Sequence, residues 1–401
     1  MSMTVFILGG YGVFGGRLAK RLIQETDHTV IIAGRSRSKA EAFCAENGGT
    51  SQVADRDDVV SLRQALSRAE PDIVVDASGP FDFDGTIKSY RVASCALEVG
   101  AHYIDLADNA DFVSNISMLD FAARAANRCV LSGVSSVPCL SSAAVEALSA
   151  DMQSIDEIDM AIIPGNRAPR GKAVVESILY QAGKPFGQWE NGKWRRRHCW
   201  SSLRTTTLNL PNCGPIKNRL ISPIEVPDQR LFPSHFQANS VRFSAGLELR
   251  TMHLGLWGLT GLVHLRVMKS LRPLAGLMHR VATWFEPLGS DRGGMYVDVS
   301  GRLSSGENVK RRWTLIAEEG DGPQVPATPA RAMIDALLDG SIGSGARPAV
   351  GTLRLDAIEK HFATFAIKTG TKESSLHLPD DHAPRRVSRA KRADHAGVVA
   401  A

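Results

Sequence analysis

The chain has 401 residues, of which 43% are hydrophobic and 22% charged, and its formal net charge is +5. The length allows two domains, the composition excludes a fibrous or low-complexity protein, and the small net charge gives no reason to expect nucleic-acid binding. No apolar run reaches the roughly 18–20 residues that span a bilayer, and the apolar residues 4–8 are too few for a signal peptide, so we expect a cytoplasmic protein.

A glycine-rich turn follows the first apolar run, in the sequence TVFILGGYGVFGGR at residues 4–17. Its glycines fit G-x-G-x-x-G, after a predicted strand at 5–8 and before a predicted helix at 13–24. In dinucleotide-binding folds such glycines allow a tight turn, close approach of the pyrophosphate, and packing of the helix on the strand. The residues expected to hold a pyrophosphate at the helix N-terminus are Gly10, Tyr11, Gly12, Val13, Phe14 and Gly15. The alternative is an ordinary strand-to-helix turn.

The end of the second predicted strand, residues 29–33, carries cations rather than a carboxylate. An NAD site usually has Asp or Glu here, which accepts a hydrogen bond from the ribose 2′-hydroxyl. This chain has Arg35, Ser36 and Arg37, whose guanidinium and hydroxyl groups suit a 2′-phosphate. The sequence therefore predicts NADP (NADPH) as the cofactor, against the alternative of a solvated basic turn.

Four more apolar strands alternate with helices up to residue 132. They are expected at 50–54, 72–76, 102–105 and 129–132, which predicts an α/β fold with a Rossmann-type doubly wound parallel sheet. Ligands of such sheets lie beyond the carboxyl ends of the strands. Asp55 is thus expected beside the adenine. The turn expected beside the nicotinamide half of the cofactor comprises Ser78, Gly79, Pro80 and Phe81.

About the first 140 residues resemble the saccharopine dehydrogenase-like family of NADP-binding proteins. The segments that carry the resemblance are ILGGYGVFGGRLA, IIAGRSRSKAEAF, VVDASGPF and GAHYIDLAD, in this order and spacing. The chain departs from the family after the sixth strand, where Cys139 occupies the place of a glycine. The resemblance implies an NADP-dependent oxidoreductase that transfers hydride at a C–N bond (an imine or a secondary amine) of an amino-acid-derived small molecule.

Such a reaction needs an acid or base beside the nicotinamide and cations for the substrate carboxylates. Asp105 and Asp108 follow the fifth strand and are the acid/base candidates, unless they only cap the next helix or hold the loop. The candidates to bind a substrate carboxylate are Arg167, Arg170 and Lys172, in a Gly/Pro-rich loop. A solvated loop is the alternative there, and no metal site is expected.

Two other functions remain open for the same sequence. The first is a reductase of a lipid-like or enoyl substrate, in which residues 253–285 would cover an apolar ligand. The second is a protein that binds NADP without catalysis, as a redox sensor or scaffold.

Residues 253–285 are rich in Leu and Trp and are interspersed with Arg266, Lys269, Arg272 and Arg280. One interpretation is a pair of interfacial amphipathic helices that contacts a membrane or an apolar substrate. The sequence favours the other, a helical hairpin broken near Pro273 that closes the core or a dimer interface. Two β-hairpins are also predicted in this half of the chain, one around Asn191-Gly192 and one formed by 295–303 and 308–318.

Four segments are expected along the chain. Residues 1–138 form the NADP-binding Rossmann domain, and 139–344 form a second, α+β domain with an antiparallel sheet, which binds the substrate and joins a homodimer. Residues 345–371 are expected to return to the first domain, by analogy with similar chains, and 372–401 to be a polar, disordered tail. The six cysteines include no C-x-x-C pair, which favours free thiols.

Overall fold

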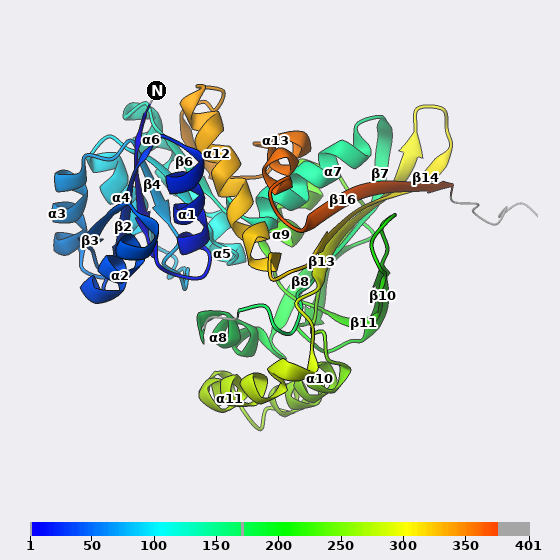
Figure 1. The fold of residues 1–401 in the computed structure, drawn as a ribbon. Helices are drawn as coiled ribbons and strands as arrows, with labels where there is room; N and C mark the ends of the chain where they lie inside the picture. The colour runs from blue at the N-terminus through cyan, green and yellow to red at the C-terminus, as the bar shows by residue number, and fades with distance from the viewer. Residues whose placement is uncertain (1, 170–171, 376–401) are drawn as a thin grey trace, which may run out of the picture.

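The computed structural model describes residues 2–169 and 172–375 (Figure 1). Within these residues, seven strands form a parallel sheet in the order β15-β6-β5-β4-β1-β2-β3. Its strands are β1 (Thr4–Leu8), β2 (Thr29–Gly34), β3 (Thr50–Val53), β4 (Ile73–Asp76), β5 (His102–Asp105), β6 (Cys129–Ser132) and β15 (Gly345–Pro348). The chain order reverses beside β1, as in a doubly wound sheet, so the predicted fold class is confirmed for the first domain.

Helices cover both faces of this sheet, which explains why its strands are apolar throughout. Val5 and Ile7 of β1 pack in one core cluster, whereas Phe6 and Leu8 pack in another on the opposite face. The helices are α1 (Gly15–Glu25), α2 (Arg37–Asn47), α3 (Val59–Ala69), α4 (Arg91–Glu98), α5 (Ala110–Ser114) and α6 (Asp120–Ala125), with 3-10 turns η1 (Ile87–Tyr90) and η2 (Ile116–Leu119).

The segment between β5 and β6, for which the sequence predicts one helix at 111–128, is broken into α5, η2 and α6, so that prediction is wrong. Asn115 has φ −98° and ψ 5°, and its side-chain amide donates to the Asp111 carbonyl at 2.8 Å. This local hydrogen bond competes with the helical ladder, so α5 ends and η2 begins.

A second sheet in the described residues has nine strands, seven of them in the order β10-β11-β12-β7-β13-β14-β16, with β8 paired to β12 and β9 to β8. β7 and β12 are parallel, and the other pairs are antiparallel. The strands are β7 (Met152–Ile163), β8 (Pro185–Glu190), β9 (Lys193–His198), β10 (Arg204–Leu208), β11 (Ile216–Pro223), β12 (Ser240–Gly246), β13 (Gly293–Leu303), β14 (Asn308–Ala317) and β16 (Ile367–Ser375). β16 includes residues 372–375, which the sequence placed in the polar tail; the rest of that tail lies outside the described residues.

Both predicted hairpins are confirmed. β8 and β9 are joined by Asn191 and Gly192, whose φ angles of 50° and 71° are those of a tight hairpin turn. Trp189 and Trp194 face each other across the pair, with ring centroids 5.1 Å apart. β13 and β14 form the second hairpin.

One face of the second sheet packs against helices that also contact the first domain. These are α7 (Ser141–Ser149), α9 (Pro227–His235), α12 (Thr328–Leu338) and α13 (Leu355–Glu359), with the short turns η3 (Ser136–Leu140), η6 (Gly322–Ala327) and η7 (Lys360–Phe362). One core cluster runs from Ile7 through Ile334 to Trp313, so the two sheets share a hydrophobic core.

Arg21 of α1 forms hydrogen bonds across the junction between the two domains. Its buried guanidinium donates to the hydroxyl of Thr328 and to the carbonyl of His361, each at 3.0 Å, and to the carboxylate of Glu25 at 3.0 Å. The first helix of the chain is thereby connected to its last helical turns.

A third group of helices lies at the lower end of the second sheet in Figure 1, below the first domain. It consists of α8 (Lys172–Gln181), α10 (Arg250–His264) and α11 (Ala275–Phe285), with the turns η4 (Arg272–Leu274) and η5 (Glu286–Leu288). The predicted break near Pro273 is confirmed, and the group has its own core cluster. Among the described residues, no helix combines the length and the apolarity needed to cross a membrane.

Candidate functional site

The turn between β1 and α1 is built from glycines that have no room for side chains. Gly9 has a φ of +81°, and a Cβ there would lie 2.7 Å from the Ala77 carbonyl oxygen. Gly9, which the sequence analysis did not include, therefore provides the left-handed turn. The signal was present, because two glycines follow Leu8 directly.

The three predicted glycines hold the turn close to the helix. A Cβ on Gly15 would lie 2.4 Å from the Gly9 carbonyl oxygen, and one on Gly12 would lie 3.0 Å from the same oxygen. Gly10 is confined as well, because a Cβ there would lie 2.9 Å from the Ile7 carbonyl oxygen. The backbone of the turn can therefore pack this tightly only without side chains.

The N-terminus of α1 lies at this turn, where Gly15 and Gly16 are buried and the Gly16 N–H donates to the Gly12 carbonyl at 2.9 Å. α1 begins at Gly15, and the residue before it, Phe14, gives no side-chain cap. The first N–H groups of the helix, beside Val13 and Phe14, thus form the kind of helix N-terminus that binds anions.

Tyr11 connects this turn to the end of β2. Its hydroxyl accepts a hydrogen bond from the Ser36 backbone N–H at 3.1 Å. A Cβ on Gly34 would lie 2.5 Å from that hydroxyl, so only glycine fits beneath the ring. The predicted pyrophosphate turn and the predicted ribose site are therefore neighbours.

The polar and basic residues after β2 differ in whether their side chains already have partners in the protein. Ser36 caps α2, because its hydroxyl accepts from the Lys39 backbone N–H at 3.4 Å. Arg37 is 3.8 Å from Glu41 in an exposed ion pair. Arg35 is exposed and forms no ion pair with any side chain that the structure describes. Arg35 is thus the cation best placed to meet a 2′-phosphate.

Arg56 holds the turn after β4, a role that the sequence did not reveal. Its guanidinium donates to the carbonyls of Ser78 and Pro80, at 3.1 and 3.0 Å, and lies 5.3 Å from the ring centroid of Phe81. Asp55 next to it accepts from the Asp57 backbone N–H at 3.0 Å, which shapes the loop after β3. Arg56 therefore joins the adenine-side loop to the expected nicotinamide-side turn.

The turn from Ser78 to Phe81 is fixed at both ends. Ser78 donates from its hydroxyl and its N–H to the buried carboxylate of Asp76, at 2.5 and 2.9 Å. Phe81 is buried against Phe112, with ring centroids 5.3 Å apart. Between them, Gly79 and Pro80 are exposed or half-buried at the strand ends.

Asp105 is fully buried at the end of β5. One carboxylate oxygen, Oδ1, accepts from the N–H groups of Ala107 and Gly133 and from the hydroxyl of Ser132, at 3.0, 2.8 and 3.0 Å. The other, Oδ2, has no hydrogen-bond partner among the described residues. Burial raises the pKa of Asp105 to about 7, and the nearby charge of Asp76 adds to this. Asp105 thus ties two loops together and does not reach solvent.

Asp108 is placed differently from Asp105. Its side chain is exposed, three residues beyond the buried carboxyl. The protein packed around it still raises the pKa of its carboxyl above the ordinary value. The cap of the following helix is provided by Asn109, which accepts from the Phe112 N–H at 3.0 Å. Asp108 therefore remains available for chemistry at the end of β5.

The second domain brings the polar side chains of α9 next to α5. Arg230 of α9 bridges Asp111 of α5 and Glu225, the latter at 2.7 Å. Asp228, also on α9, is fully buried and accepts from the Ser141 hydroxyl, while its Oδ2 has no partner in the described chain. Burial raises the pKa of Asp228 to about 7. These residues gave no sequence signal, because Arg230 contacts Asp111 of the first domain and the partner of Asp228, Ser141, is 87 residues earlier in the chain.

The cationic loop of the second domain lies elsewhere. Arg167 is exposed and donates to the Pro287 carbonyl at 3.2 Å, while its N–H donates to the Ser290 carbonyl at 2.9 Å. Its described contacts thus lie with the segment after α11. Arg170 and the side chain of Lys172 lie outside the described residues.

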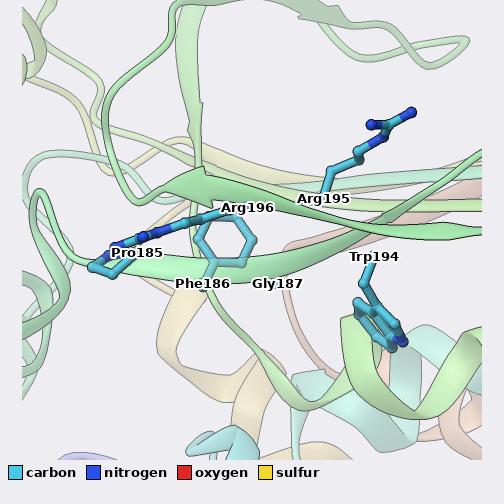
Figure 2. Close-up of a pocket in the computed structure, with 6 residues that line it drawn as sticks. All are labelled: Pro185, Phe186, Gly187, Trp194, Arg195 and Arg196. Atoms are coloured by element: carbon cyan, nitrogen blue, oxygen red, sulfur yellow. The ribbon is translucent and has the colours of Figure 1, made fainter.

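Two pockets of the described chain lie on the β8–β9 hairpin. One, of about 420 Å³, is lined by Pro185, Phe186, Gly187, Trp194, Arg195 and Arg196 (Figure 2). In Figure 2, Trp194 and Arg195 point to opposite sides of the strand. The other, of about 350 Å³, includes Arg204 and Arg242. Neither pocket includes a residue from the strand ends of the first sheet.

Comparison with protein families identifies the first domain. Residues 5–135 match the family described as saccharopine dehydrogenase NADP binding domain. The first domain is a saccharopine dehydrogenase-like NADP-binding domain. Its residues fit this cofactor, because the turn can fold this tightly only with glycines, as dinucleotide-binding turns require, and Arg35 follows β2 where an NAD site would have a carboxylate.

The whole fold also has a counterpart among solved structures. Apo saccharopine dehydrogenase (L-Glu forming) from Saccharomyces cerevisiae is 14% identical, with a TM-score of 0.65 over 92% of this chain and 100% of that one. This likeness shows that the NADP-binding domain and the second domain share the yeast protein's fold. GenD2 from gentamicin A biosynthesis, in complex with NAD, is 13% identical over 94% of this chain and 97% of that one, with a TM-score of 0.42. A search of curated proteins finds no match.

Proposed function

We propose that the protein is an NADPH-dependent oxidoreductase that acts at a C–N centre of an amino-acid-derived substrate. The observation that carries the proposal is the position of Asp108, an exposed carboxyl three residues beyond the buried Asp105. It lies at the strand ends where the nicotinamide half of the cofactor is expected. The saccharopine dehydrogenase family of the first domain supports a C–N bond as the reacting centre.

The reaction divides between the cofactor and the chain. Bound NADPH supplies the hydride that the imine carbon accepts. Asp108 donates a proton to the imine nitrogen, so that C=N becomes a secondary amine, and it takes the proton back in the oxidative direction. A carboxyl with a raised pKa keeps its proton closer to neutral pH, which suits this role. Asp105 acts as a positioning residue, because it fixes the loops on both sides of Asp108's strand end.

The proposal is tested by NADPH oxidation with a panel of 2-oxo acids, each combined with an amino acid. Asp108→Asn should lower kcat by roughly 10²–10⁴-fold, the usual contribution of a general acid, and leave the Kd for NADPH unchanged. Asp27→Asn is the matched control. Asp27 is exposed just before β2, at the amino ends of the strands, whereas Asp108 lies beyond their carboxyl ends. Unchanged kcat in Asp108→Asn would remove the residue from the mechanism.

A second candidate is reduction of a C=C bond in a lipid-like substrate. It is favoured by the exposed apolar side chains of α10 and α11, among them Trp257 and Trp284. Turnover of enoyl thioesters without turnover of any oxo acid and amine pair would replace the first proposal by this one. Tight NADPH binding without turnover in either panel would instead favour a sensor or scaffold.

A further inference from the structure

The helices α10 and α11 lie at one end of the molecule, below the first domain in the view of Figure 1, and carry exposed apolar side chains. Trp284 is 77% exposed, Leu265 is 74% exposed and Val267 is 69% exposed. We call the exposed apolar residues of this segment the apolar tip, which consists of Leu254, Trp257, Leu265, Val267, Leu277, Trp284 and Leu288. An exposed apolar patch of this kind usually marks an interaction surface.

The apolar tip is not part of the core of its own helices. That core uses other positions, Leu256, Leu271 and Ala275, which are buried against α8. Glycines lie among the tip residues at positions 255, 258, 261 and 276, and each has open space where its Cβ would be. At these four positions, therefore, no side chain of the described residues covers the helices.

The charge of the same segment is entirely positive. Residues 250–285 contain no Asp or Glu, and they include Arg250, Arg266, Lys269, Arg272 and Arg280. The last four are exposed. None of the ion pairs between described side chains includes Arg266, Lys269 or Arg280, whereas arginines such as Arg204 and Arg311 are paired with carboxylates. Unneutralised cations thus lie directly beside the apolar tip.

We propose that the apolar tip and its cations dock the protein on an anionic phospholipid surface. Trp and Leu side chains enter the boundary between headgroups and acyl chains, and the Arg and Lys side chains pair with lipid phosphates. The contact is peripheral, since the described helices are not long and apolar enough to span. A second copy fits less well, because a symmetric contact would bring Arg266, Lys269 and Arg280 of both copies into one interface without a carboxylate from the same segment.

The test is sedimentation of the full chain with two kinds of vesicle, phosphatidylcholine alone and phosphatidylcholine containing phosphatidylglycerol. Binding to the anionic vesicles should be at least about tenfold tighter, since each basic residue near such a surface contributes about 1 kcal/mol, and it should weaken with salt. Leu265→Glu/Val267→Glu should abolish it. Phe121→Glu is the matched control, because Phe121 is 88% exposed on the first domain, and this variant should still bind.

Other outcomes would overturn the proposal. Equal binding to both vesicles, or binding that survives Leu265→Glu/Val267→Glu, would exclude docking through the apolar tip. The proposal would also fail if the protein binds no vesicles but forms a dimer in sedimentation equilibrium, and the double variant is monomeric. That result would assign the surface to a second copy. NADPH binding by each variant shows that the variant is folded. This control does not depend on the substrate proposed above.

Discussion

Asp76 and Asp105 lie opposite each other at the last paired position of β4 and β5. Both carboxyls are buried, and each fixes a turn beyond its own strand. The proximity of Asp76 helps to keep the pKa of Asp105 near 7. The end of the sheet is therefore held together by two buried carboxyls, one of which, Asp105, changes its protonation near neutral pH.

The first prediction is that Asp105 makes stability fall as pH rises. Its pKa is about 7 in the folded chain against an ordinary value of 3.8, so the folded state binds the proton more tightly than the unfolded state. The stabilisation is complete below the ordinary value and is lost as pH rises towards 7, a loss of about 4 kcal/mol. Asp105→Asn should flatten this dependence in urea unfolding at pH 4.5 and 7.5. An unchanged slope would contradict the raised pKa, and Asp228→Asn should act with the same sign.

The second prediction concerns the choice of cofactor. Arg35→Asp should weaken NADPH much more than NADH in a fluorescence titration, because a charge-assisted contact to the 2′-phosphate is worth about 1.5–3 kcal/mol, or roughly ten- to a hundredfold. Arg68→Asp makes the same charge change on the exposed face of α3 and should leave both affinities nearly unchanged. If NADPH and NADH weaken equally in Arg35→Asp, Arg35 does not contact the 2′-phosphate.

The third prediction separates two glycines by their surroundings. Gly15→Ala places a methyl group 2.4 Å from a backbone oxygen, so it should displace the turn, lower the Tm and weaken NADPH by more than about tenfold. Gly258→Ala lies within a helix and has nothing within 4 Å, so it should stabilise the protein by about 0.5–1 kcal/mol. Calorimetry and NADPH titration on both variants decide the matter, and equal NADPH affinities would argue against a cofactor role for the turn.

The fourth prediction concerns the junction of the two domains. Arg21→Met leaves Glu25, Thr328 and the His361 carbonyl without their shared donor, and should lower the free energy of unfolding by about 3–5 kcal/mol. Arg124→Met breaks an exposed pair with Asp120 and should cost less than about 1 kcal/mol. Urea unfolding compares the two directly, and a similar small effect for both would show that Arg21 does not hold the junction.

The strands of the first domain could be predicted from sequence because each is buried on both faces. The bounds of β5 and β6 agree with the expected residues 102–105 and 129–132. The glycine turn and the cations after β2 could also be predicted, because each lies within a few consecutive residues. The nine-stranded sheet was visible only in part, because β10, β11 and β12 pair across loops whose lengths carry no pattern.

The environment of the candidate acids could not be predicted. Asp105 and Asp108 look alike in the sequence, but Asp105 is buried and accepts hydrogen bonds from Ser132 and Gly133, whereas Asp108 is exposed. Arg56 was hidden because its acceptors are carbonyl oxygens, which every residue has. Asp228 was hidden because its partner Ser141 is 87 residues earlier in the chain.

β15 has a consequence for how the protein forms. It covers the edge of β6, yet it is synthesised more than two hundred residues later. A nascent chain that has completed β6 therefore leaves the ribosome with an open sheet edge, which other chains can pair with until residues 345–348 arrive. The completed enzyme closes its first domain last, so truncation anywhere in the second domain also leaves the cofactor domain unfinished.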